Sequence, residues 1–298
     1  MSKESAILQV AADTGYSTKR ITLYKYITPL ALEGLIEHGD FKLTYRNDAN
    51  DPFECLPRSS IFSDEMLSHI GIISLTSNPS NHPMWGNYAD KFKGACVEFS
   101  FDYFYTDPDK EPANKGEELA LEGIEYKKMG TLVYFLQYWN DGDVKRIDMR
   151  GGDVLLKCHY SSERSEAGCM MFDCVPLAYT KTEQYKKRKK EKARIFNQKL
   201  WRQVSTKHPD WKYEDEYRIT MRDDGCTRNL ELKTGETIHL SNKITRYVTK
   251  IILGPCSIFT PEQILEKLNA HRPISNLSEN VRVVKAGFSE HLFDLIIP

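Results

Sequence analysis

Two glutamates set two residues apart, Glu214 and Glu216, have the spacing that most directly suggests chemistry in this sequence. They lie in the stretch "WKYEDEYRIT", whose alternation of polar and apolar residues predicts a half-buried strand over 213–221. Residues i and i+2 of a strand point to the same face, so the two carboxylates are expected to project together. Such a pair can divide the work of glycosidic cleavage, one carboxylate stabilising positive charge on the sugar and the other orienting the attacking group. The alternative is a strand edge whose charges are balanced by Lys212 and Arg218.

Two further stretches carry side chains suited to binding a polar ligand. In "IISLTS", Ser74 and Thr76 share a strand face and offer small hydroxyls, although Ser and Thr are also common where a strand ends in a turn. In "LYKYIT", Tyr24 and Tyr26 share one face and Lys25 lies on the other. Tyrosines in strands are ordinary core residues, but a lysine between two of them can also bind a hydroxyl or a phosphate.

Together, these three stretches resemble the ADP-ribosyltransferase superfamily. The active cleft of that superfamily takes a His or Arg from a first strand, a hydroxyl or tyrosine from a second, often within Ser-Thr-Ser, and a Glu from a later strand, often in Glu-x-Glu. The matching positions here are Lys25, Ser74 and Glu216. Lys25 departs from the His or Arg of that pattern, and "SLT" is not the full Ser-Thr-Ser.

The resemblance implies NAD as co-substrate, with no metal cofactor. Cleavage of the nicotinamide–ribose bond builds positive charge on the ribose, which a nearby carboxylate stabilises in a site shielded from water. Glu216 is expected to do this, and Glu214 to orient or deprotonate the acceptor. The cofactor-binding residues are expected to be Tyr24, Lys25, Tyr26, Ser74, Thr76, Trp85 and Tyr88.

A wider set of motifs, "LYKY", "NDPFE", "SLT", "MWGNYA", "KGACVEF" and "WKYEDEYR", resembles an uncharacterised bacterial family found among mobile and phage-defence genes. This resemblance spans about residues 22–297, and the opening "LYKYITPLALEGLIEHGDFKLT" also looks like the start of DNA-directed ADP-ribosyltransferase toxins. It implies a toxin or phage-defence effector with a macromolecular acceptor, nucleic acid being one candidate, and an antitoxin protein as a second partner.

Aromatic and acidic residues outside these strands have both core and site interpretations. Trp85 and Tyr88 are three apart and therefore adjacent on a helix, where they either pack in the core or form an aromatic wall against nicotinamide or a base. "NDPFE" predicts a turn from which Glu54 can reach the cleft.

A run of five cations lies in a predicted helix. Such a run is usually a solvated face, but it can also neutralise several phosphates of a nucleic acid. The candidate nucleic-acid-binding residues are Lys186, Lys187, Arg188, Lys189 and Lys190.

The elements that must position these residues alternate between strand and helix. Residues 21–28 predict a strand, and the helix that follows ends at Gly39. A helical turn is expected over 84–91 and a strand over 94–101. Near the C-terminus, "TPEQILEKLNAH" predicts a helix with Thr260 as its N-cap, flanked by the strands "VTKIILGP" and "VRVVKAG". The stretches "GTLVYFLQYW" and "GGDVLLKCHYS" fit either strand or helix.

This order predicts an α+β fold, with an ADP-ribosyltransferase-like split β-sheet core and helical insertions as the resemblance implies. One domain over 1–298 is expected, with an N-terminal lead over 1–20 and insertions over 102–122 and 176–204. No internal repeat is apparent in the sequence.

Composition excludes some classes of protein and leaves several functions open. A formal net charge of −1 gives no overall field for nucleic acid or membrane, so such a partner needs a local patch. Scattered cysteines without CxxC and histidines without HExxH predict reduced thiols and no metal site. The absence of a signal-like start or a long apolar run predicts a cytoplasmic protein with no membrane partner. NAD hydrolysis, a nuclease whose carboxylates hold Mg²⁺ and a non-catalytic nucleotide-binding sensor remain the alternatives.

Overall fold

The computed structural model describes residues 17–51, 53–55, 69–105, 135–138, 145–149, 153–165, 182–188, 202–221, 226–275, 277–292 and 294–298. The strands are β1 (Ser17–Ile27), β2 (Phe41–Leu43), β3 (Gly71–Thr76), β4 (Ala95–Tyr105), β5 (Phe135–Tyr138), β6 (Lys145–Met149), β7 (Asp153–Lys157), β8 (His159–Tyr160), β9 (Thr206–Lys207), β10 (Glu216–Met221), β11 (Arg228–Glu231), β12 (Thr237–Ser241), β13 (Val248–Leu253), β14 (Arg282–Lys285), β15 (Gly287–Phe288) and β16 (Leu295–Ile296). The α-helices include α2 (Pro29–His38), α4 (His82–Tyr88) and α8 (Pro261–Ser275), and the 3-10 helices include η1 (Arg46–Asp48), η2 (Pro209–Glu214) and η4 (Thr245–Tyr247).

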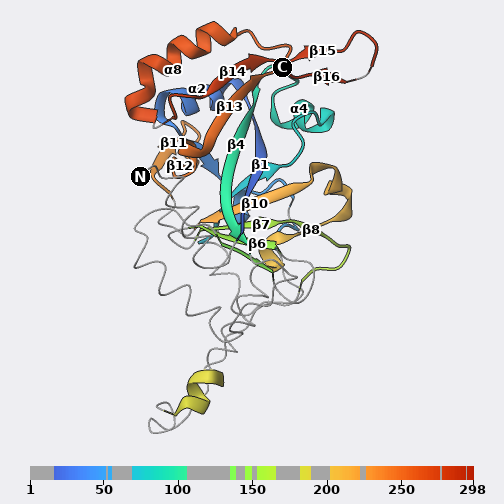
Figure 1. Cartoon of the computed structure of the whole chain (residues 1–298), viewed down its shortest axis with the longest axis vertical. Helices are drawn as coiled ribbons and strands as arrows, with labels where there is room; N and C mark the ends of the chain where they lie inside the picture. The colour runs from blue at the N-terminus through green and yellow to red at the C-terminus, as the bar shows by residue number, and fades with distance from the viewer. Residues whose placement is uncertain are drawn as a thin grey trace.

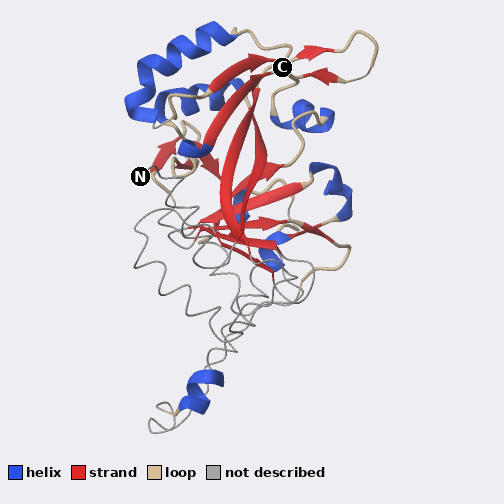
Figure 2. Cartoon of the chain, in the orientation of Figure 1, coloured by secondary structure: helices blue, strands red, loops and turns tan. Residues whose placement is uncertain are grey.

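The described strands form one large mixed sheet with smaller sheets beside it (Figure 2). The large sheet has the order β1-β3-β10-β7-β6-β5-β4-β13-β14 and is mostly antiparallel, and β4 also pairs with β1 over the full length of both strands. The long β1 and β4 cross the middle of the molecule side by side (Figure 1). Strand β1 meets β3 at one residue pair, Tyr24 with Thr76, so the sheet opens on either side of this pair.

Helices α2 and α8 pack against each other at the end of the molecule where β13 and β14 lie (Figure 1). Helices are thus gathered at one end of a mostly antiparallel sheet, which makes this an α+β fold, as the sequence predicted. Among the described helices, none combines the length and the apolar character needed to cross a bilayer.

Local signals in the sequence set the ends of these helices. The Thr28 hydroxyl accepts a hydrogen bond from the Ala31 amide, and Pro29 occupies the first turn of α2. Gly39 ends α2 with φ of 73°, and a Cβ at this position would lie 2.0 Å from the Ser275 carbonyl oxygen of α8. Glycine is therefore required here both by backbone conformation and by the close approach of α8.

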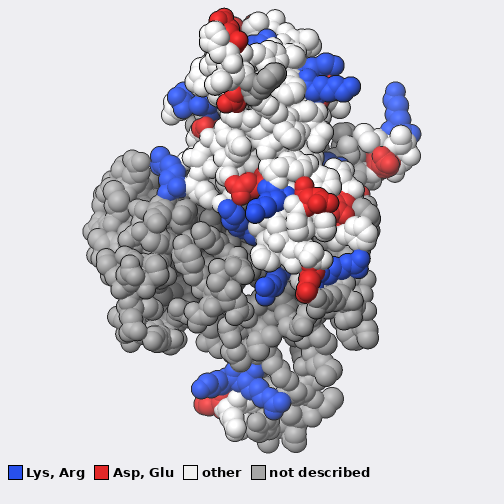
Figure 3. Space-filling model, turned by 90° about the vertical axis from the view of Figure 1, so that its right-hand side faces the viewer, with Lys and Arg blue, Asp and Glu red and all other residues white. Residues whose placement is uncertain are grey.

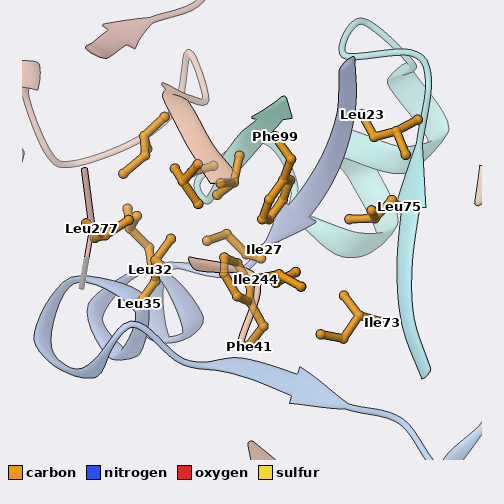
Figure 4. Packing of buried hydrophobic residues seen from close by; sticks show 14 of the residues in the cluster. Leu23, Ile27, Leu32, Leu35, Phe41, Ile73, Leu75, Phe99, Ile244 and Leu277 are labelled. Carbon is orange, nitrogen blue, oxygen red and sulfur yellow. The ribbon is translucent and has the colours of Figure 1, made fainter. Parts of the chain in front are cut away.

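The main core lies between the sheet and the helices α2 and α8. The buried side chains drawn there come from strands, helices and connecting turns far apart in sequence: Leu23, Ile27, Leu32, Leu35, Phe41, Ile73, Leu75, Phe99, Ile244 and Leu277 (Figure 4). Each contributes roughly 1.5–3 kcal/mol when fully buried, so this cluster fixes how the strands are positioned. A second cluster, centred on Trp85 and Tyr26, packs α4 against the other side of β1.

Several predicted boundaries need correction. The strand predicted over 213–221 begins at Glu216, because residues up to Glu214 form η2. Strand β1 begins at Ser17, inside the predicted lead over 1–20, and β4 continues to Tyr105, inside the predicted insertion over 102–122. Pairing of β1 with β4 along their whole length extends both strands beyond their apolar segments.

Other predictions are confirmed, or lie outside the described residues. Helix α8 begins after Thr260, whose side chain and that of Gln263 exchange hydrogen bonds with each other's backbone amides in a capping box. The two ambiguous stretches contain strands β5, β7 and β8. The helix predicted over 176–204 is described at 183–188 and 202–205, and the rest of it, like the remainder of 102–122, lies outside the described residues.

Candidate active site

A pocket opens where β1 and β3 diverge, and seven of the nine predicted catalytic and cofactor-binding residues line it. These are Tyr24, Lys25, Tyr26, Ser74, Tyr88, Glu214 and Glu216. Their elements β1, β3 and β10 are adjacent in the sheet, which brings together residues nearly 200 positions apart in the chain. The segment after β2 also lines the pocket, through Thr44, Asp48, Ala49, Asn50, Asp51 and Glu54.

Glu214 and Glu216 reach the pocket by a different route from the one predicted. Glu214 is the last residue of η2, and Asp215 then adopts a left-handed conformation with φ of 39° before β10 begins at Glu216. The two glutamates therefore do not share a strand face, and the prediction that alternation within one strand brings them together is wrong. The turn at Asp215 nevertheless directs both carboxylates to Lys207, and both side chains are about 4% exposed.

The floor of the pocket is a buried ion cluster formed by two cations and three carboxylates. Its members are Glu54, Lys207, Glu214, Glu216 and Arg218. The Lys207 ammonium bonds to Glu214 Oε2 and lies 3.0 Å from Glu216 Oε2 and 3.1 Å from Glu54 Oε1. Removing such a charge from water is unfavourable unless it is paired, and here each carboxylate has at least one cationic partner.

Arg218 completes the cluster from beneath the pocket. Its Nε donates to Glu216 Oε1 and its Nη2 to Glu216 Oε2, each at 3.0 Å, while Nη2 also donates to Glu54 Oε1 at 2.9 Å. Its Nη1 donates to the Val204 carbonyl at 2.7 Å. This paired geometry holds the Glu216 carboxylate in one orientation.

The charges around Glu216 keep it ionised. Burial by itself raises the pKa of this carboxyl group, but Arg218 and Lys207 more than offset burial and lower it to about 2. For Lys207, burial favours the neutral amine, yet the carboxylates of Glu216 and Glu54 raise its pKa well above the ordinary value. At neutral pH, Glu216 is thus a fixed negative charge and a weak base.

Glu214 is held as firmly as Glu216. Its Oε1 accepts a hydrogen bond from the Tyr88 hydroxyl at 2.6 Å, and its Oε2 accepts from Lys207. Burial and this hydrogen bond to Glu214 raise the pKa of the Tyr88 hydroxyl, which therefore stays a donor. The aromatic ring of Trp211 lies 4.9 Å from the Lys207 ammonium and shields the cluster from one side.

Lys25 and Ser74 lie together at the divergence of β1 and β3. The Lys25 ammonium donates to the Ser74 carbonyl oxygen at 3.2 Å, and the Ser74 hydroxyl lies near enough to Glu216 to help lower the pKa of that carboxyl group. Burial lowers the pKa of Lys25 to about 8, the Glu216 carboxylate raises it, and the Lys42 cation lowers it further. Lys25, Ser74 and Glu216 therefore lie close together and line the same pocket.

Two predicted ligand-binding residues lie outside the pocket. Trp85 is 0% exposed, and its Nε1 donates to the Pro79 carbonyl at 2.8 Å, so it is a core residue of α4 and not an aromatic wall. Thr76 is also fully buried, and its Oγ1 accepts from the Asn78 amide in the turn after β3. Trp85 thus follows the core-packing alternative, and Thr76 the strand-end and turn alternative, that the sequence left open.

The two tyrosines of β1 line the pocket and also pack in the second core cluster. The Tyr26 ring packs edge-on against Trp85 with 5.2 Å between centroids, and its hydroxyl donates to the Asn78 carbonyl at 2.8 Å. Burial and the nearby Glu98 raise the pKa of Tyr24 to about 12. Both hydroxyls remain protonated donors at neutral pH.

Sequence reasoning missed Lys207, Lys42 and Trp211 as pocket residues and gave Glu54 only as able to reach the cleft. Lys207 lies two residues after the helical segment 202–205 and is buried, but no local pattern in the sequence marks it as a pocket residue. No local pattern marks Lys42, an exposed residue between the buried Phe41 and Leu43.

The candidate nucleic-acid-binding run is partly described. Lys186, Lys187 and Arg188 are exposed on a short helical segment, and Lys186 pairs with Glu183 at 2.6 Å. Lys189 and Lys190 lie outside the described residues. In the view of Figure 3, acidic and basic side chains lie side by side near the middle of the molecule, and further Lys and Arg side chains gather at its lower end.

No group of three or more His, Cys, Asp or Glu side chains within the described ranges is arranged to hold a metal ion. The three carboxylates of the floor are instead bonded to Lys207 and Arg218, an arrangement that fits a divalent metal poorly.

Comparisons with known proteins give one match. Residues 84–219 match the model of a family described as "Protein of unknown function (DUF2971)", a segment that includes α4, β4 and the start of β10. No curated protein and no solved structure gives a significant match. The chain is thus similar, from Met84 to Ile219, to an uncharacterised domain family whose matched segment includes Tyr88, Lys207, Glu214 and Glu216 of the pocket.

Proposed function

We propose that this pocket binds NAD and that the chain is an ADP-ribosyltransferase-like enzyme that cleaves the nicotinamide–ribose bond. The observation that carries the proposal is the meeting of Lys25, Ser74 and Glu216 from the adjacent strands β1, β3 and β10. These are the three positions, matched by the resemblance to that superfamily, that supply the first-strand residue, the hydroxyl and the glutamate.

In this proposal Glu216 stabilises the positive charge that develops on the ribose. A carboxylate with a pKa of about 2 is ionised throughout the physiological range, and the ion pairs to Arg218 and Lys207 fix its orientation before substrate arrives. A preorganised charge of this kind stabilises a transition state without the cost of reorganising water. Its weak basicity is no obstacle, because stabilising a cation requires charge and position, not proton transfer.

Glu214 is proposed to orient the attacking group. Both of its oxygens already accept hydrogen bonds, from Tyr88 and from Lys207, so taking a proton from an acceptor requires exchange of one partner. This observation favours a second candidate function, NAD hydrolysis, in which water is the acceptor and needs less activation once the nicotinamide has left.

The biological role is proposed from the resemblance to proteins of mobile and phage-defence genes. In this view the protein is a cytoplasmic toxin or defence effector, and its acceptor is a macromolecule. Expression of the wild-type chain in a bacterial host should slow growth, and expression of the Glu216→Gln chain should not.

The test of the central proposal is nicotinamide release from NAD by wild-type protein and by Glu216→Gln. Loss of one preorganised electrostatic group is expected to lower the rate by roughly 10²–10³-fold. Glu231→Gln is the matched control, because Glu231 is exposed on β11 and should retain full activity. Full activity in a folded Glu216→Gln protein would refute the assignment.

Transfer and hydrolysis are distinguished by the fate of the label. Incubation with NAD labelled in the adenosine half and a cell lysate, followed by protease or nuclease digestion, identifies a protein or nucleic-acid acceptor. The Glu214→Gln variant is expected to reduce labelling of the acceptor more than it reduces nicotinamide release, because hydrolysis depends less on acceptor orientation.

A further inference from the structure

Two of the lysines that line the pocket form no ion pair with a carboxylate among the described residues. Lys25 comes from β1 and Lys42 from β2, and both line the pocket. No ion pair joins either lysine to a carboxylate among the described residues, although Asp48 and Asp51 line the same pocket. Asp51 is engaged elsewhere, since its oxygens accept from the Phe53 amide and the Trp211 indole.

The orientation of Lys42 follows from its strand. Residues 41 and 43 on either side are buried in the main core, so alternation directs Lys42 away from the core and toward the pocket. Its pairing with Leu240 of β12 holds the backbone in this register. The backbone position of Lys42 is therefore fixed by the pairing of β2 with β12 and by the two core residues beside it.

The two cations influence each other. Lys25 is partly buried, and this burial lowers its pKa to about 8, with Lys42 contributing in the same direction. The carboxylate that raises the Lys25 pKa, Glu216, is already bonded to Arg218 and Lys207. Like charges placed together without a committed anion are unfavourable, and an anionic ligand between them removes that cost.

We infer that Lys25 and Lys42 form an anion subsite for a phosphate or pyrophosphate group, next to the carboxylate floor. The pocket is then polarised, with a cationic wall for the phosphates and an anionic floor for the positively charged end of the ligand. As an account of how NAD is oriented, this rests on the proposed function. As an anion site, it rests on the placement of the two lysines, so the two ideas can fail separately.

The direct test is calorimetric titration of the full chain with inorganic pyrophosphate, with ADP-ribose and with adenosine. Pyrophosphate and ADP-ribose should bind and uncharged adenosine should not. In Lys25→Met and in Lys42→Met, the dissociation constant for both anions should rise about 10-fold or more, the effect of losing one hydrogen bond to a charged group. Lys233→Met, at an exposed hairpin position, is the matched control and should bind as wild type does.

Proton uptake gives a second readout that a purely structural lysine would not change. An anion beside Lys25 favours its charged form, so binding near pH 8 should take up a fraction of a proton, measured from titrations in two buffers of different ionisation enthalpy. The groups facing Lys25 are Glu216 from β10 and Lys42 from β2, and Glu216 stays ionised at this pH. Uptake should vanish in Lys25→Met and persist in Lys42→Met.

The outcomes separate the two proposals. Anion binding that depends on both lysines, with no NAD cleavage, supports the subsite and refutes the enzyme. NAD cleavage with pyrophosphate affinity unchanged in both lysine variants supports the enzyme and refutes the subsite. If Lys25→Met fails to fold by circular dichroism, Lys25→Arg keeps the charge and should retain anion binding, and Lys42→Met, at an exposed position, still decides the inference.

Discussion

Arg218 donates to both carboxylate oxygens of Glu216, the residue two positions earlier on the same strand, at 3.0 Å each. The i and i+2 pair that shares a face of β10 is therefore a glutamate with an arginine, and not two glutamates. Glu214 joins them from outside the strand through the Lys207 ammonium. This relationship explains how like charges can lie so close together in a buried site, because cations separate them.

Replacing Lys207 should destabilise the protein strongly. Lys207→Met leaves the buried carboxylates of Glu214 and Glu216 with one fewer cation, and breaking such a cluster costs about 3–5 kcal/mol of unfolding free energy. Lys212→Met is the control, because Lys212 is exposed on η2 and should change stability by less than about 0.5 kcal/mol. Urea denaturation of both variants measures the difference.

A double replacement checks that the loss comes from uncompensated charge. In Lys207→Met with Glu54→Gln, one carboxylate partner of Lys207 is neutral as well, so part of the lost stability should return. Strict additivity of the two single changes would mean that the cluster is not energetically coupled.

The stability of the protein should fall steeply in acid because of Glu216. Its pKa is about 2 in the folded protein and 4.5 in the unfolded chain, so the unfolded state binds more protons between these values. The stabilisation is complete above pH 4.5 and is lost as pH falls toward 2, a change of about 3 kcal/mol. Unfolding free energies measured from pH 2 to 7 should show wild type and Glu216→Gln converging in acid, and a constant gap between them would contradict the assignment.

Trp85 and Tyr88 should respond to substitution in opposite ways, although they lie three residues apart on α4. Trp85→Phe replaces a buried indole with a smaller ring and removes its hydrogen bond to Pro79, so it should lower stability by about 1–3 kcal/mol while ADP-ribose affinity stays the same. Tyr88→Phe frees one oxygen of Glu214 inside the pocket and should alter NAD turnover. If ADP-ribose affinity changes in Trp85→Phe and not in Tyr88→Phe, then Trp85 and not Tyr88 faces the ligand, which contradicts the orientation of α4 described above.

The exposed cations Lys186, Lys187 and Arg188 should contribute little to folding. Replacing all three with glutamine should change the unfolding free energy by less than about 1 kcal/mol, since exposed charges add little stability. If nucleic acid is the acceptor, its binding should weaken and the dependence of affinity on salt should become shallower. Lys233→Gln is the control, and an unchanged salt dependence would show that the run serves solvation alone.

Local chemistry in the sequence determined the elements of this protein. Thr28, Pro29 and Gly39 fix the ends of α2, and Thr260 with Gln263 fixes the start of α8, because caps and backbone conformations depend on neighbouring residues in the chain. The alternation of polar and apolar residues marked most of β10 as a strand for the same reason. The α+β class followed from the order of these elements.

Tertiary structure decided which of the candidate side chains meet. Trp85 faces inward and Tyr88 faces the pocket because of the side on which α4 packs against β1, which spacing within a helix does not specify. Asp215 turns the chain so that Glu214 leaves the strand pattern, and Lys207 and Glu54 arrive from segments whose neighbours in sequence give no sign of their partners. The ion cluster depends on contacts across as many as 164 positions of sequence, between Glu54 and Arg218. Such contacts are set by the pairing of strands and by core packing between segments far apart in the chain. A local sequence pattern, by contrast, depends only on residues within the same turn, helix or strand.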